Sequence, residues 1–146
     1  MTAWTKSGVY LLNWIDVLDA TQLAIDLSLT TNTLALFDSS VTPDFSADAA
    51  FTTTGECTST NYTSKGAALA NPTVTESPTG SIMWDNTADV SWTPVTLTSQ
   101  GGIVIDGTTG TVLIMGIYWG AEYTATAGTF TVTPNVLGLL TLANPA

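Results

Sequence analysis

The sequence predicts an all-β fold: a jelly-roll-like antiparallel β-sandwich of about 8–10 short strands, with one short N-terminal helix. Three observations predict it. Apolar and polar residues alternate along much of the chain that follows the N-terminal segment, as in half-buried strands. Thr, Val, Ile and aromatic residues fill these alternating segments, as strands prefer. Turn-forming residues separate the segments at short intervals, which favours an antiparallel sandwich over alternating helices and strands.

Only the N-terminal segment has helical spacing. From Trp4 to Leu18, apolar residues recur at intervals compatible with the period of an α-helix. Gly8 lowers the helix propensity by about 1 kcal/mol relative to alanine. The helix is therefore expected over residues 5–18, or over the part of that range that follows Gly8, where it would cover one face or end of a sheet.

Beyond the helix, the period of the apolar residues changes to two. Leu23–Thr30 and Thr33–Phe37 are the first two predicted strands, and residues 43–60 form a polar stretch. That stretch is expected to be a long surface loop, with room for one helical turn at Ser46–Phe51. The later strands are predicted at Ala67–Ala70, Thr73–Glu76, Ser81–Asp85, Val90–Thr93, Ile103–Asp106, Val112–Trp119, Thr129–Thr133 and Leu139–Leu142.

Turn residues mark the ends of these strands. The predicted turns are Asn71-Pro72, Ser77–Gly80, Asp85–Thr87, Gly101-Gly102, Gly107–Gly110, Ala127-Gly128 and Asn135–Gly138. Glycine, proline, asparagine and aspartate suit these positions because they adopt or stabilise turn conformations. Since a chain of about 150 residues buries one core, residues 1–146 are expected to be a single domain.

The charge balance excludes several classes of function. The chain has 2 Lys+Arg against 12 Asp+Glu, no His, and a formal net charge of −10. Nucleic-acid binding is not expected, because phosphates are neutralised by several basic side chains. Membrane insertion is not expected either, because no apolar run approaches the roughly 18 residues of a spanning helix. Asn13, Asp16 and Asp19 interrupt the N-terminal apolar run, so no secretory leader is expected.

No residue pattern predicts catalysis, a cofactor or a metal. Cys57 is the single cysteine and has no His nearby, so a buried thiol is favoured over an activated nucleophile. Asp85–Asp89 offers oxygen atoms, but it lacks the ligand spacing of a calcium loop. A turn-forming role is the favoured interpretation of this segment, and metal binding is the alternative. A glycosidase-like carboxylate pair has no support from spacing. The chain is therefore not expected to be an enzyme.

The aromatic residues leave two interpretations open. Trp84, Trp92 and Trp119 lie in or at the end of predicted strands, which favours core or interface packing over a platform that stacks on sugars. The segment Val112–Trp119 is apolar on both faces. It is expected to be a central strand, with contact to a neighbouring subunit as the alternative.

A series of strand and turn segments, spread over residues 30–142, resembles a known family. The segments are Leu34–Asp44, Asn61–Gly66, Ser81–Trp92, Gly102–Asp106, Gly120–Tyr123, Ala127–Asn135 and Gly138–Leu142. In this order they resemble a family of small tailed-bacteriophage virion proteins, which are head-decoration or other accessory structural proteins. The resemblance implies a protein made in the host bacterial cytoplasm and located in the virion, with no active site.

The function that this resemblance implies is capsid decoration. The chain would bind the outside of the head shell, with the major capsid protein as its partner, and would stabilise the shell through apolar and main-chain contacts. It would also form a homo-oligomer, with a trimer as the expected form. A tail-associated structural protein and a carbohydrate-binding module for host attachment are the alternatives.

Two apolar segments and one strand end are the candidate contact elements. The candidate interface residues are Trp4, Tyr10, Leu11, Trp14, Tyr118, Trp119, Leu139, Leu140 and Leu142. The alternative is that the N-terminal segment and the last strand only close the sandwich.

Overall fold

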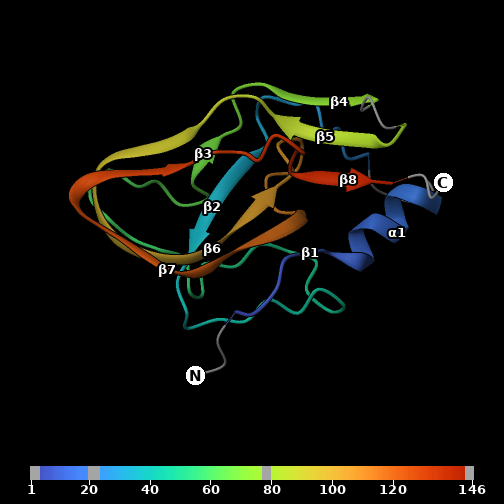
Figure 1. Ribbon diagram of the computed structural model, residues 1–146. Coiled ribbons are helices and arrows are strands. Elements are labelled where there is room, and N and C mark those ends of the chain that lie inside the picture. The colour runs from blue at the N-terminus through green and yellow to red at the C-terminus, as the bar shows by residue number, and fades with distance from the viewer. Residues whose placement is uncertain (1–3, 20–23, 77–79, 144–146) are drawn as a thin grey trace.

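The computed structural model describes residues 4–19, 24–76 and 80–143 (Figure 1). This part of the chain forms two antiparallel sheets and one short helix, so the predicted all-β, sandwich-like fold is confirmed. The elements are β1 (Gly8–Val9), α1 (Leu11–Asp19), β2 (Thr33–Phe37), β3 (Ala67–Ala68), β4 (Pro72–Glu76), β5 (Ile82–Asn86), β6 (Val90–Ile105), β7 (Leu113–Val132) and β8 (Leu140–Leu142).

The larger sheet has the strand order β1-β7-β6-β2-β3, and the smaller sheet has the order β4-β5-β8. In β2, Leu34 and Leu36 belong to the hydrophobic cluster that also contains Trp84 of the smaller sheet. Ala35 and Phe37, which point the other way, belong to a second cluster. The larger sheet is therefore buried on both faces, which explains why its central strands are apolar almost throughout.

The second face of the larger sheet is covered by irregular chain. Trp4 and Tyr10 of the N-terminal segment pack there, together with Phe45 and Phe51 of the long polar stretch. Residues 43–60 contain turns and two isolated bridges, one at Ala50 and one at Glu56, with no helix. The loop prediction is thus confirmed, but the helical turn expected at Ser46–Phe51 is limited to hydrogen bonds around Asp44.

Two strands are far longer than expected. β6 has 16 residues and β7 has 20, and each contains two of the predicted strands. The strand total matches the prediction among the described residues, whereas the expectation that all strands are short is wrong. The two strands pair along most of their length and curl together around one end of the sandwich, on the left in Figure 1. We call the curled part, Val90–Ser99 with Tyr123–Val132, the β6–β7 ribbon.

Two predicted turns lie inside these strands. Gly101-Gly102 is part of β6 and pairs with Tyr118 and Ile117 of β7. Ala127 has a φ of 47°, so β7 bends there, but Gly128 still pairs with Val95 because β6 bends with it. Both glycine-containing segments therefore shape the strands and do not end them.

The first predicted strand is wrong. Leu23 lies outside the described residues, and the residues from Ala24 to Asn32 form turns, with Leu29 N donating to Asp26 O at 3.3 Å. Ile25 and Leu27 nevertheless pack against the core, while their neighbours are exposed. The alternation of apolar and polar residues in this segment thus reflects alternating burial of side chains, without pairing of the segment in a sheet.

The helix is shorter than the full predicted range. It begins at Leu11, so the alternative in which it follows Gly8 is confirmed. Gly8 itself lies in β1 and packs against the Phe45 ring, where a Cβ would come within 2.9 Å of Cδ2. The N-terminal residues are extended because they pair with the edge of β7, at Gly8↔Gly116 and Val9↔Met115.

Candidate functional site

Helix α1 places a polar residue toward the protein interior. Asn13 is buried, and its Nδ2 donates hydrogen bonds of 2.7 Å to the carbonyl oxygens of Ala49 and Leu113. Trp14 lies beside it, half-buried, with Nε1 donating to Ile114 O at 3.0 Å. These contacts fix which face of the helix meets β7.

The opposite face of α1 carries large apolar side chains into solvent. Leu11, Leu12, Ile15 and Leu18 are 47%, 45%, 55% and 78% exposed. They follow one another at helical spacing and form one stripe, which we call the helix stripe. Helices on soluble proteins normally turn this kind of face toward the core. In α1 the inward face already carries Trp14, which packs against the core beside Asn13, so the apolar stripe left outside is a candidate contact surface.

The smaller sheet extends beyond the core that it covers. Ile82 pairs with Leu142 and Trp84 pairs with Leu140, so these four side chains lie on one face of the sheet. Trp84 is buried and Leu140 is half-buried, whereas Ile82 and Leu142 are more than half exposed. The overhanging end of this face is a second exposed apolar area.

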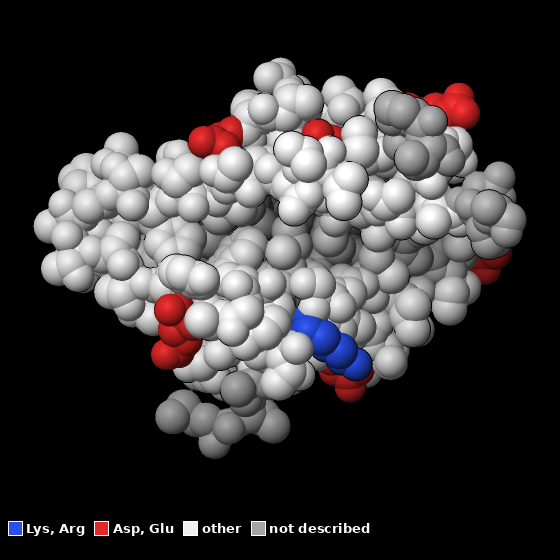
Figure 2. All heavy atoms as spheres, in the orientation of Figure 1, with Lys and Arg blue, Asp and Glu red and all other residues white. Residues whose placement is uncertain are grey.

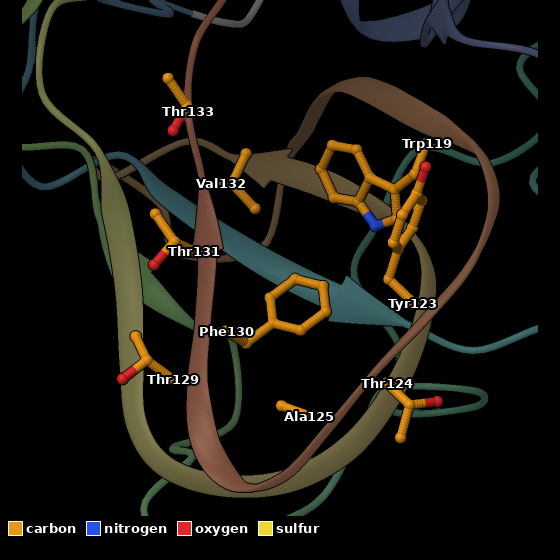
Figure 3. Close-up of a pocket in the computed structure, with 9 residues that line it drawn as sticks. All are labelled: Trp119, Tyr123, Thr124, Ala125, Thr129, Phe130, Thr131, Val132 and Thr133. Atoms are coloured by element: carbon orange, nitrogen blue, oxygen red, sulfur yellow. The ribbon is translucent and has the colours of Figure 1, made fainter.

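A groove of about 420 Å³ lies in the bend of β7 (Figure 3). Trp119 and Tyr123 form one wall, and Phe130, Ala125 and Val132 line the bend itself. No charged side chain lines this groove. Its lining consists of these five aromatic and aliphatic side chains together with Thr124, Thr129, Thr131 and Thr133, so the groove is uncharged and partly polar.

Trp119 is held in place by a bulge. Ser99 pairs with Tyr123 while Gly101 pairs with Tyr118, so residues 119–122 of β7 bulge opposite Gln100. The Trp119 Nε1 donates to Ser99 Oγ at 3.0 Å, and Tyr118 Oη donates to the carbonyl of Gly120 at 2.9 Å. The indole is thus fixed at the groove and not freely rotating.

The single thiol is protected. Cys57 is buried, and burial, assisted by the negative charge of Asp38, raises the pKa of its thiol to about 12. A nucleophilic thiolate needs the opposite shift. A hollow beside it is lined by Asp38, Glu56 and Glu122, but no group of three or more Asp, Glu or Cys side chains in the described ranges is arranged to hold a metal ion.

The amide in the Asp85–Asp89 segment has structural partners. Asn86, within the Asp85–Asp89 segment, is buried; its Oδ1 accepts from Asn71 N and its Nδ2 donates to Ala88 O. This is the turn-forming role favoured from the sequence.

The structure sorts the candidate interface residues into three groups. Trp4 and Tyr10 are 1% and 0% exposed, so the prediction that their side chains contact a partner is wrong: both fill the second hydrophobic cluster. Leu11 and Leu142 are exposed. The half-buried candidates are Trp14, Tyr118, Trp119, Leu139 and Leu140. For every candidate other than Trp4 and Tyr10, contact with a partner remains a prediction.

Sequence reasoning missed most of the helix stripe. Leu12, Ile15 and Leu18 were treated as part of a core-facing helix, because periodicity shows that a face exists without showing where it points. The available signal was Asn13, which follows Leu11-Leu12 and precedes Trp14. A polar residue inside an apolar run either faces solvent or is buried with a specific hydrogen-bond partner, so it can indicate which side of a helix faces the interior.

Trp84 and Trp92 are buried, at 2% and 5% exposure, which confirms the core interpretation for both. Leu113, Ile114 and Met115 are buried as well and face both hydrophobic clusters, which confirms the central-strand interpretation for this part of β7. Stacking of a sugar on Trp84 or Trp92 is therefore excluded.

Acidic side chains are scattered over the face shown in Figure 2, and the end of the molecule formed by the curled β6–β7 ribbon is white. In the described part of the chain, no helix is long and apolar enough to cross a membrane.

Comparisons with known proteins found no protein-family model, no curated protein and no solved structure that matches this chain.

Proposed function

We propose that this chain is a structural protein of a tailed-bacteriophage virion, which decorates the outside of the head shell and stabilises it. The proposal rests on the resemblance of its strand and turn segments to that family. The observation that supports it best is the helix stripe: four large apolar side chains, Leu11, Leu12, Ile15 and Leu18, point into solvent from one helix. A surface of this kind is stable in water when another protein covers it.

The charge and chemistry of the chain fit the same role. A net charge of −10 limits unspecific association at high copy number, and the only thiol is buried and protonated at neutral pH. Full burial of two exposed leucine-sized side chains contributes about 3–6 kcal/mol. Because Leu11 and Ile15 are already about half buried, the helix stripe would supply part of the free energy that holds the protein on a shell, alongside other contacts.

The test compares two double variants with nearly equal starting exposure. Leu11→Gln with Ile15→Gln changes side chains that are 47% and 55% exposed on the helix, and Val74→Gln with Ile82→Gln changes side chains that are 46% and 55% exposed on the smaller sheet. We expect the helix pair to lower the affinity for purified empty shells by about 10- to 100-fold. The sheet pair should leave that affinity unchanged.

The wild-type chain should also raise the melting temperature of the shells. Shells that neither bind the chain nor change their melting temperature would contradict the proposal. Loss of binding in the sheet pair alone would move the contact from α1 to the smaller sheet. Immunogold labelling of intact particles distinguishes a position on the head from a position on the tail. Labelled tails would favour the alternative of a tail-associated structural protein.

Carbohydrate binding is the second candidate, because Trp119 and Tyr123 line an open groove. Two of the threonine hydroxyls that line it already bond across the ribbon: Thr124 with Thr98 at 2.7 Å and Thr129 with Thr93 at 2.8 Å. A sugar site combines an aromatic surface with polar groups that fix orientation, and this groove provides mainly the first. Saturable quenching of Trp fluorescence by cell-wall glycans would favour this candidate.

A further inference from the structure

The two edges of the β6–β7 ribbon differ in how their main-chain groups are satisfied. On β6, side chains of the loop that follows Glu56 cover the edge. Asn61 Nδ2 donates to Pro94 O at 3.0 Å, Thr96 N donates to Ser59 Oγ at 2.9 Å, and Cys57 Sγ donates to Thr98 O at 3.2 Å. Alternate residues of this edge thus have a partner, so a further strand cannot add to it.

The edge of β7 is covered only in its first part. β1 pairs with it at Met115 and Gly116, and Tyr118 N donates to Ser7 Oγ at 2.9 Å. From Tyr123 to Val132, the described residues provide no strand partner on the side away from β6.

The register shows where main-chain groups of this open edge point. Thr98 lies directly opposite Thr124, and the carbonyl of Thr98 faces outward, to Cys57. Residues that oppose each other in an antiparallel pair either bond to each other or both point away. The N–H and C=O of Thr124 therefore point out of the open edge of β7.

The sequence of this edge lacks the charged residues and prolines that keep strands from associating. The run from Tyr123 to Thr133 contains no charged residue and no proline, and Thr occupies about every second position. Edge strands of soluble proteins are normally protected by charges, prolines, bulges or a covering loop. Of these, this edge has the bend at Ala127, where the register with β6 shifts, so the segments Tyr123–Ala125 and Gly128–Val132 on either side of the bend are the ones open to a partner strand. An uncharged segment of high β-propensity instead favours pairing with another strand.

The groove opens beside the same edge. Figure 3 shows Trp119 and Tyr123 on one arm of the curved β7, with Phe130 between the two arms. Tyr123 is 54% exposed although it is a large aromatic residue. The outward-pointing main-chain groups and the exposed aromatic wall thus belong to the same segment of β7.

We propose that this edge pairs with the same edge of a second copy of the chain, antiparallel about a twofold axis, and that each copy buries its Tyr123 and groove in the contact. Identical edges satisfy a twofold, isologous contact without further adaptation. Both strands of the ribbon, Val90–Ser99 and Tyr123–Val132, are free of charged residues. Two chains of net charge −10 therefore meet there without placing like charges against each other.

The inference deepens the proposed function by naming the contact between copies. It also changes the expected oligomer, because a twofold contact of this kind makes a dimer and not a trimer. It concerns the purified chain alone, so its failure leaves the proposed binding to shells untested and intact.

The experiment measures the mass of the full chain by sedimentation velocity over a range of concentrations. We expect a species of twice the 15.2 kDa of one chain. Association should strengthen as salt is added, because salt screens the repulsion between two acidic copies. A contact with a basic partner would show the opposite dependence.

A matched pair of variants locates the contact. Ser91 and Thr131 face each other across the ribbon, both exposed, with their hydroxyls 3.1 Å apart. Thr131→Asp places a charge on β7, the strand with the open edge. Ser91→Asp places the same charge on β6, the strand whose edge the loop covers from Pro94 to Thr98, and both variants remove the same hydrogen bond. We expect Thr131→Asp to weaken the dimer at least about tenfold and Ser91→Asp to leave it nearly unchanged.

A further variant, Tyr123→Ser, removes the exposed aromatic side chain without adding charge, and it should also weaken the dimer. The proposal is overturned by a wild-type chain that stays monomeric, by a trimer, or by equal effects of Ser91→Asp and Thr131→Asp. Dissociation of the dimer by a glycan that quenches Trp fluorescence would instead support the dimer contact, since it shows that the groove is covered in the dimer.

Discussion

Gly102 lies directly beneath the indole of Trp119: a Cβ on Gly102 would come within 2.9 Å of Trp119 Cζ2. Its neighbour Gly101 lies beneath Trp4 on the other side of β6, where a Cβ would come within 2.8 Å of the Trp4 ring. The two glycines therefore give two tryptophans room on opposite faces of one strand. A side chain at either position would separate the layers.

The first prediction follows from this contact. Gly102→Ala should lower the free energy of unfolding by about 1–3 kcal/mol, because the added methyl group collides with Leu34 Cδ1 and the Trp119 ring. Gly128→Ala is the control, since the nearest atom to its Cβ is 3.6 Å away, at ordinary contact distance. Urea unfolding of the two variants measures the difference, and equal losses of stability would contradict the assigned role of Gly102.

The second prediction concerns the inward face of α1. Asn13→Leu should lower the free energy of unfolding by about 1–3 kcal/mol although it adds an apolar residue, because it removes the donor that satisfies the Leu113 carbonyl. Leu12→Asn changes an exposed neighbour, so its effect should stay within about 0.5 kcal/mol. Urea unfolding again provides the measurement. A stabilised Asn13→Leu variant would show that the interior side of α1 tolerates an apolar side chain.

Much of the fold could be predicted from the sequence because local patterns encode burial directly. Period-two alternation and turn residues indicated the strands from Ala67 onward. What they could not indicate is whether neighbouring strands continue through a glycine. Gly101-Gly102 has the composition of a turn, and its actual role depends on Trp4 and Trp119, which are distant in sequence.

The candidate contact surface was less predictable for a related reason. An apolar period identifies an amphipathic helix, but the direction of its faces depends on what the rest of the chain offers. In α1 the carbonyls of Ala49 and Leu113 select Asn13 for the interior, and the leucines are left outside. Likewise, Trp4 and Tyr10 were expected at a contact surface because nothing local shows that the loop with Phe45 covers them.

The third prediction compares two tyrosines. The buried hydroxyl of Tyr10 has no hydrogen-bond partner in the described part of the chain. The hydroxyl of Tyr62 accepts from Leu36 N at 2.8 Å and donates to Glu56 Oε1 at 3.1 Å. Tyr10→Phe should therefore leave stability unchanged or raise it by about 1 kcal/mol, and Tyr62→Phe should lower it by about 1–3 kcal/mol. Thermal unfolding of both variants measures the contrast, and a destabilised Tyr10→Phe would indicate a bound water or ligand at that hydroxyl.

The last prediction concerns alkaline pH. Burial, with a contribution from Asp38, raises the pKa of the Cys57 thiol from 9.0 to about 12, and burial raises the pKa of Tyr10 and Tyr62 as well. Below pH 9 the thiol is protonated in both the folded and the unfolded chain, so it adds no pH dependence.

Between about pH 9 and pH 12 the unfolded chain releases the thiol proton while the folded chain retains it. The unfolded state then binds fewer protons, so the free energy of unfolding should fall as the pH rises through this range. Cys57→Ala should lower stability at pH 8 through lost packing, yet show a shallower fall at higher pH; the tyrosines supply the part that remains. Urea unfolding at about pH 8, 10 and 11 measures how steeply the free energy of unfolding of the wild type and of Cys57→Ala falls with pH. Identical slopes would mean that the thiol titrates normally in the folded chain, and rapid alkylation of the folded protein at pH 8 would then be expected as well.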